Sequence, residues 1–258
     1  MARYSPQFNA FKLVLKFDKI NFYLTWSAFI LALVPIIIDQ FDLIKKNNED
    51  VKSIIEIFSM IVILAGFIIV SIKDFYLFPK AETKRRHDFI DNGLGVTFSL
   101  RNSEDYYTNN DLTPGMYKLG VNLFQNVYFT TLISKKMRPK HIWKASSFAG
   151  VFILIAIYGL KNSPIALPIL QFLFSASILG DLIKLLLFVN RNEKILDQVK
   201  TFFSAGVKNE SIILKNYIEY ETNLAWGMIL LDDTIFNKYN TETEQEWQAI
   251  KNRYNIHG

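Results

Sequence analysis

Few residues of this chain have the types and spacing that catalysis requires. The 258 residues include no cysteine, which excludes disulfides, thiolate metal sites and a cysteine nucleophile. The histidines His87, His141 and His257 are far apart in sequence and form no ligand pair. No Gly-x-Ser-x-Gly, His-Glu-x-x-His or phosphate-binding motif is present. We therefore expect neither an enzyme nor a bound cofactor or metal.

An acid and a base three residues apart, Asp181 and Lys184, stand at the end of an apolar run. At this spacing they share a helix face, and charges beside a membrane usually pair or face water. They are therefore either an ion pair at the interface or the gate of an ion path. On the same run, Gln171, Ser175 and Ser177 form a polar stripe that would line such a path.

The densest basic cluster is Lys84, Arg85 and Arg86. One interpretation is a topology determinant beside anionic lipid, and the other is a site for a phosphate or nucleotide. The acidic pairs Glu104-Asp105 and Asp232-Asp233 are not expected to be catalytic, because adjacent residues on a helix point in different directions.

The elements that would position these residues are four runs with no charged side chain. They cover residues 20–38, 57–72, 145–160 and 162–180. A helix of about 20 residues crosses a hydrocarbon core of about 30 Å, and flanking lysines extend the two shorter runs. The alternative is four buried helices of a soluble protein. Four runs that are each flanked by charge favour the membrane.

Charge placement sets the expected orientation. Of the 29 Lys and Arg residues, 25 fall on one side of such a membrane and 4 on the other. The positive-inside rule then places both termini and the segment between the two pairs of runs in the cytosol. Residues 1–19 interleave basic and apolar side chains, which is typical of an amphipathic stretch on the cytosolic face or of a basic retention flank.

The cytosolic segments are expected to be mainly helical. Pro79 would kink or end the second helix, and Asn92-Gly93 permits a short hairpin. A helix is predicted from Thr113 to about Arg138-Pro139, packed on the tail or on a neighbouring subunit. Thr241 to Glu244 reads as a capping box that begins another helix. The apolar stretch 226–236 is expected to be buried against protein.

The predicted fold class is therefore an all-α integral membrane protein with four transmembrane helices in two pairs. Its expected parts are a cytosolic N-terminal segment, a first hairpin, a cytosolic insert, a second hairpin and a helical cytosolic tail. Their predicted bounds are 1–19, 20–72, 73–144, 145–189 and 190–258.

This arrangement, together with the insert FIDNGLGVTFSLRNSEDYYTNNDLTPGMYKLGVNLFQNVYFTTLISKKM, resembles a family of four-transmembrane, pore-forming effectors of bacterial antiviral systems. The resemblance implies a role in abortive infection through depolarisation or rupture of the inner membrane. It also implies that a nucleotide second messenger or a sensor protein delivers the signal. It carries no functional residue over to this chain.

Three functions compete. The first is a membrane effector that opens a conducting or disruptive path, and it needs a homo-oligomer because four helices cannot enclose a wide pore. The second is a non-conducting anchor or receptor that recruits a soluble partner. A transporter or membrane enzyme ranks last, because no ionisable group lies deep in the runs. The expected partners are the lipid bilayer and a second copy of the chain, without direct nucleic-acid binding.

Overall fold

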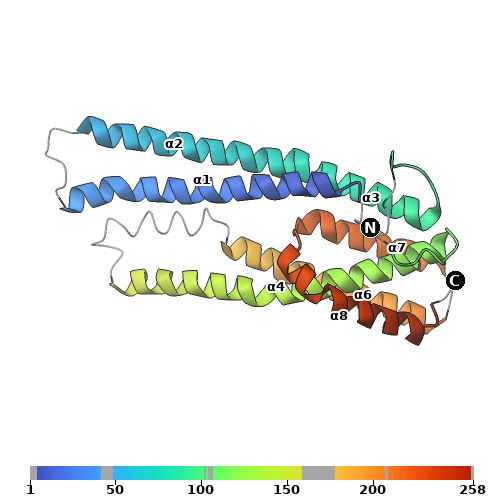
Figure 1. The fold of residues 1–258 in the computed structure, drawn as a ribbon. Coiled ribbons are helices and arrows are strands. Elements are labelled where there is room, and N and C mark those ends of the chain that lie inside the picture. Colours follow the sequence, from blue (N-terminus) through green and yellow to red (C-terminus); the bar gives the residue numbers. More distant parts are fainter. Residues whose placement is uncertain are drawn as a thin grey trace. The chain divides into compact units, whose positions relative to one another are not determined.

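Every regular element that the structure describes is a helix. The computed structural model describes residues 5–41, 49–101, 103, 107–158, 178–206 and 209–256 (Figure 1). The elements are α1 (Phe8–Phe41), α2 (Glu49–Ile72), the π-helix η1 (Lys73–Leu77), α3 (Phe78–Leu94), α4 (Met116–Tyr158), α6 (Ile178–Ser204), α7 (Glu210–Gly227) and α8 (Asp233–Arg253). The expected all-helical class is confirmed for these residues.

The helices form two compact units. Unit 1 comprises Met1–Phe11, Phe78–Lys140 and Ile183–Gly258, and unit 2 comprises Lys12–Leu77 and His141–Leu182. The chain passes between the units within α1, from η1 to α3, within α4 and within α6. Each passage is thus made by helical backbone and not by a loop.

Unit 2 contains most of the apolar sequence. Two helical stretches, Phe8–Pro35 and Asp50–Leu94, are long and apolar enough to cross a membrane, and none of the apolar window in either is buried. The third predicted span, 145–160, falls in α4 as far as Tyr158. Residues 159–177, which include most of the fourth predicted span, lie outside the described residues.

Helices α1 and α2 of unit 2 lie side by side (Figure 1). A Cβ atom added at Gly66 of α2 would lie 3.7 Å from Asn21 and 3.9 Å from Leu24 of α1, so the two backbones approach closely there. Near the junction with η1, the Lys73 ammonium lies 2.8 Å from the Asp18 carboxylate of α1. Small residues and this ion pair hold the two helices together.

The helical backbone does not end at Pro79. It changes type instead, from α2 through the five-residue π-helix η1 into α3, in which Pro79 is the second residue. Proline supplies no backbone N–H and removes one helix hydrogen bond. The irregular turn therefore lies next to the place where the regular bonding pattern is interrupted.

The main core of unit 1 is aromatic. The Phe124 ring of α4 contacts Trp247 of α8 edge to face at 5.4 Å between centroids, and stacks on Phe203 of α6 at 5.3 Å. Trp247 and Phe124 are fully buried. The helix after Thr113 thus packs against the tail, which is one of the two partners expected for it.

A second apolar cluster of unit 1 joins α4, α6 and the segment before α8. Its fully buried members include Ile133 of α4 and Leu185 of α6, and Ile229 and Leu231 pack against it. The expectation that the stretch 226–236 is buried is not met, because its residues are half-buried or exposed, although several of them pack against this cluster.

The expected hairpin at Asn92-Gly93 is wrong. Both residues lie in the last turn of α3, and Gly95, with φ of +72°, follows the helix in the left-handed conformation common after helix ends. Gly93 serves close packing instead, because a Cβ atom there would lie 2.6 Å from Leu119 Cδ1. Gly93 is therefore required by the contact with α4 and not by a turn.

Two predicted helix ends are also wrong. α4 continues through Pro139 to Tyr158, and side chains on both sides of this proline are held by the tail: Arg138 lies 3.4 Å from Glu193 and Lys140 lies 3.1 Å from Asp232. The helix thus continues through the proline, although proline removes one of its hydrogen bonds. The expected capping box at Thr241 lies inside α8, which already begins at Asp233.

Candidate functional site

The residues predicted to gate an ion path are described only in part. Asp181 is half-buried and Lys184 is exposed, both in the first turns of α6. Gln171, Ser175 and Ser177 lie outside the described residues.

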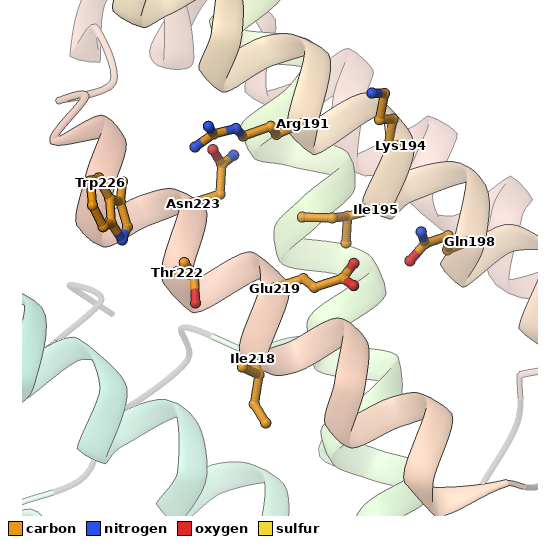
Figure 2. A pocket seen from close by; sticks show the side chains of 9 residues that line it. All are labelled: Arg191, Lys194, Ile195, Gln198, Ile218, Glu219, Thr222, Asn223 and Trp226. Atoms are coloured by element: carbon orange, nitrogen blue, oxygen red, sulfur yellow. The ribbon is translucent and has the colours of Figure 1, made fainter.

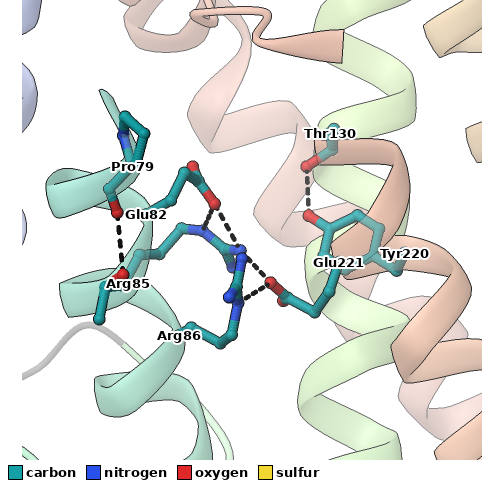
Figure 3. A network of polar contacts seen from close by, with 8 residues as sticks. Pro79, Glu82, Arg85, Arg86, Thr130, Tyr220 and Glu221 are labelled. Atoms are coloured by element: carbon teal, nitrogen blue, oxygen red, sulfur yellow. Dashed lines mark hydrogen bonds and ion pairs between the residues drawn. The ribbon is translucent and has the colours of Figure 1, made fainter. Parts of the chain in front are cut away.

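The predicted basic cluster is divided by the fold of unit 1. Lys84 is exposed on α3. Arg85 donates to Glu82 at 2.9 Å and to Glu221 of α7 at 2.5 Å (Figure 3). Arg86 donates to the same Glu221 oxygen at 3.0 Å. Two of the three cations therefore link α3 to α7.

Glu221 is the residue on which this ionic network depends, and sequence reasoning missed it. Its side chain is 9% exposed, and that of Arg85 is 14% exposed. Two acids and two guanidinium groups balance in charge, so burial does not leave an uncompensated ion. The neighbouring Tyr220 hydroxyl shares a 2.9 Å hydrogen bond with Thr130 of α4, which extends the polar contacts to a third helix (Figure 3).

From Ile57 onward, the exposed surface of α2 is apolar. Met60, Ile61, Ile63, Leu64 and Phe67 are between 57% and 69% exposed. Successive residues of an α-helix are separated by about 100° around the axis, so these side chains cover close to half of the circumference. A helix of a soluble protein places its apolar stripe on the core and its polar face in water, which is the reverse arrangement.

Exposed aromatic rings adjoin basic residues near two places where the chain passes between the units, after Leu77 and after Lys140. Phe75 and Tyr76 of η1 are 84% and 61% exposed and follow Lys73. Trp143 of α4 is 75% exposed and precedes Lys144. Aromatic rings beside lysine are typical of the boundary between hydrocarbon and water.

A short loop of unit 1 presents apolar side chains on a fixed backbone. The Asp91 carboxylate accepts hydrogen bonds of 2.7 Å from the backbone N–H groups of Phe98 and Ser99. Nearby, Asp88 accepts one of 2.8 Å from Ser103. Phe98 and Leu100 are nevertheless 62% and 110% exposed, and one side of the Phe98 ring lies near the His87 ring. The buried acids therefore hold an exposed apolar loop.

No metal centre is found within the described part of the chain, where no three His, Asp or Glu side chains gather in a manner suited to a metal ion. No family model, curated protein or solved structure matches this chain.

Proposed function

We propose that the chain is an inner-membrane effector that crosses the bilayer four times, with both termini and unit 1 in the cytosol. A signal received by unit 1 opens a conducting or disruptive path through an oligomer of unit 2. The resemblance to antiviral pore-forming effectors supplies the biological setting, which is abortive infection.

The observation that carries the proposal is the exposed apolar arc of α2. Burying an apolar side chain such as Leu64 or Phe67 is worth about 1.5–3 kcal/mol, so a row of them in water is strongly unfavourable. They remain exposed within unit 2, since none of the apolar window of the stretch Asp50–Leu94 is buried. Lipid around the helix removes that cost, and the aromatic and basic residues at its end suit a membrane interface.

A small-residue face supports self-association. Ser146 and Gly150 of α4 are one helical turn apart and exposed, and a Cβ atom added at Gly150 would meet nothing within 4 Å. Exposed small residues at this spacing let a second helix approach closely in a bilayer. An oligomer is also what a pore requires, because two or four helices enclose no wide channel.

The absence of cysteine makes the topology directly testable. Single cysteines at Lys45 and Lys161 should react with a membrane-impermeant maleimide in spheroplasts. Single cysteines at Lys84 and Lys238 should react only after permeabilisation. Equal labelling of Lys161→Cys and Lys84→Cys in intact spheroplasts would overturn the four-span arrangement.

Conduction needs a separate measurement. Purified protein in liposomes should release a trapped ion indicator, and induced expression should collapse the signal of a membrane-potential dye. Gly150→Leu serves as the matched variant, because it blocks helix approach and should reduce both signals at equal membrane abundance. Intact potential in cells and no release from liposomes would refute an effector that conducts.

The second candidate function is a non-conducting anchor that recruits a soluble protein, and the exposed loop of Phe98 and Leu100 favours it. An apolar pair on a fixed loop is suited to docking. Phe98→Ser with Leu100→Ser should then abolish recovery of a stoichiometric partner in mild detergent. Recovery of the same partner by wild type and variant would exclude the loop as its docking site.

A further inference from the structure

A groove of about 550 Å³ lies between α6 and α7 of unit 1. Figure 2 shows Arg191, Lys194 and Gln198 along α6, and Glu219, Asn223 and Trp226 along α7. The core residue Ile195 forms part of its floor and is 4% exposed. The groove is therefore built on packed helices and belongs entirely to unit 1.

Two cationic side chains of the groove form no ion pair with the described residues. Arg191 and Lys194 are exposed, and neither has an ion-pair partner within the described ranges. Other basic residues of unit 1, such as Arg85, Arg138 and Lys140, are paired with acids. The one carboxylate on the groove, Glu219, lies 3.6 Å from Lys215 on its own helix and lies toward Gln198 (Figure 2). The Arg191 end is thus positive.

Asn223 adds a buried acceptor at the same end. Its side chain is 2% exposed, and its amide nitrogen donates to the Phe188 carbonyl at 3.1 Å, which fixes the orientation of the amide. The side-chain carbonyl oxygen has no hydrogen-bond donor among the described residues. In Figure 2 this amide lies beside the Arg191 guanidinium. A buried acceptor without a donor is unfavourable, and a ligand that donates a hydrogen bond would satisfy it.

We propose that this groove binds an organic phosphate that carries a hydroxyl or amino donor close to its phosphate group. Arg191 and Lys194 bind the phosphate, and the donor satisfies Asn223. Trp226, which is 75% exposed at the end of the groove, provides a flat surface for a planar group. Such a ligand is either a soluble nucleotide or a lipid headgroup. This inference rests on the proposed function in one respect: the ligand of the groove is the signal that unit 1 receives.

Binding is tested with full-length protein in nanodiscs. In phosphatidylcholine nanodiscs, adenosine monophosphate should bind in calorimetric titration and raise the melting temperature. In a second arm, phosphatidylglycerol in the disc replaces the nucleotide. Arg191→Gln with Lys194→Gln should weaken the effective ligand by about tenfold or more, since two charge-assisted contacts are lost. Lys84→Gln with Lys238→Gln removes the same charge outside the groove and should leave binding unchanged.

The two arms identify the source. Stabilisation by the nucleotide alone assigns a soluble ligand, and stabilisation by phosphatidylglycerol alone assigns a headgroup. If neither probe stabilises the protein, or if both double variants weaken binding equally, the groove is not a phosphate site. Release of the ion indicator from liposomes, measured with the same variants, distinguishes the two proposals. Binding of a probe without release refutes conduction only. Release that is unchanged by the groove variants and by the probes refutes the role of the groove only.

Discussion

The Arg85 guanidinium of α3 lies 2.5 Å from the Glu221 carboxylate of α7, although 136 residues separate them in the sequence. Both side chains are largely buried, and Arg86 and Glu82 complete the charge balance. The contact ties the stretch Phe78–Lys140 of unit 1 to its last stretch, Ile183–Gly258. It is therefore a contact on which the assembly of unit 1 depends.

Glu221→Ala should destabilise unit 1 by up to about 3–5 kcal/mol, because it leaves Arg85 with Glu82 alone and Arg86 without its carboxylate. Thermal unfolding in detergent, followed by circular dichroism, measures the effect. Lys84→Ala is the control, since this exposed neighbour should change stability by no more than about 0.5 kcal/mol. Equal melting temperatures for the two variants would show that the ionic network is dispensable.

Gly93→Ala should destabilise unit 1 by about 1–3 kcal/mol, because the new methyl group meets Leu119 across the α3–α4 contact. Gly66→Ala is the matched change: it is also a glycine inside a helix, but its added Cβ meets its neighbours at 3.7 Å or more. Urea unfolding of the two variants compares them. A loss of stability at Gly66 as large as that at Gly93 would contradict the assigned close approach.

Leu64→Lys separates a lipid environment from water. On an exposed helix in water the change would be almost neutral, whereas at the centre of a membrane helix lysine costs about 2.5–3.5 kcal/mol or more on insertion scales. We expect the variant to be depleted from the membrane fraction. Lys52→Leu, near the start of α2, is the control and should keep normal abundance. Full membrane abundance of Leu64→Lys would count against a lipid-facing α2.

Asp232 gives α8 a dependence on pH. Burial alone would raise the pKa of Asp232, but hydrogen bonds from Lys140 and from backbone N–H groups of the first turn of α8 outweigh it, so the pKa is lowered. The ionised carboxylate accepts from Thr234 at 2.9 Å and caps the helix. A lowered pKa means that this contribution is present above the unfolded pKa of about 3.9 and is lost as pH falls through the folded pKa.

Asp232→Asn keeps a capping oxygen but does not titrate. The melting temperature of the wild type should therefore exceed that of Asp232→Asn near neutral pH and approach it below about pH 4. Asp232→Ala should lose about 1 kcal/mol at neutral pH through loss of the cap. A difference between wild type and Asp232→Asn that stays constant down to about pH 3 would refute this assignment.

Some of this structure follows from local pattern and some does not. The apolar period after Thr113 predicted a helix and its packing, because burial of one face is encoded within a few turns. The hairpin expected at Asn92-Gly93 is wrong because the same dipeptide suits a turn or a close helix contact. The position of Leu119, which is distant in sequence, decides between them. The helix end expected at Pro139 is also wrong. The side chains on either side of this proline contact Glu193 and Asp232, which are distant in sequence.

The site was less predictable than the fold. The cluster of Lys84, Arg85 and Arg86 is visible in the sequence, but its partner Glu221 lies in a tail helix with no unusual composition. The groove between α6 and α7 combines residues whose proximity depends on how two helices pack. A lone Arg191 or Asn223 carries no signal of its own.

Unit 1 is assembled from three stretches of the chain, and the two stretches of unit 2 lie between them in the sequence. This order determines when the core of unit 1 can form during translation. Phe89, from the middle stretch, and Trp247, from the last, are buried in the same core. That core stays incomplete until α8 has been translated, by which time both stretches of unit 2 have already been made. The core of unit 1 is therefore the last part of the chain to be completed, and a chain truncated before α8 leaves an aromatic surface for chaperones and proteases to recognise.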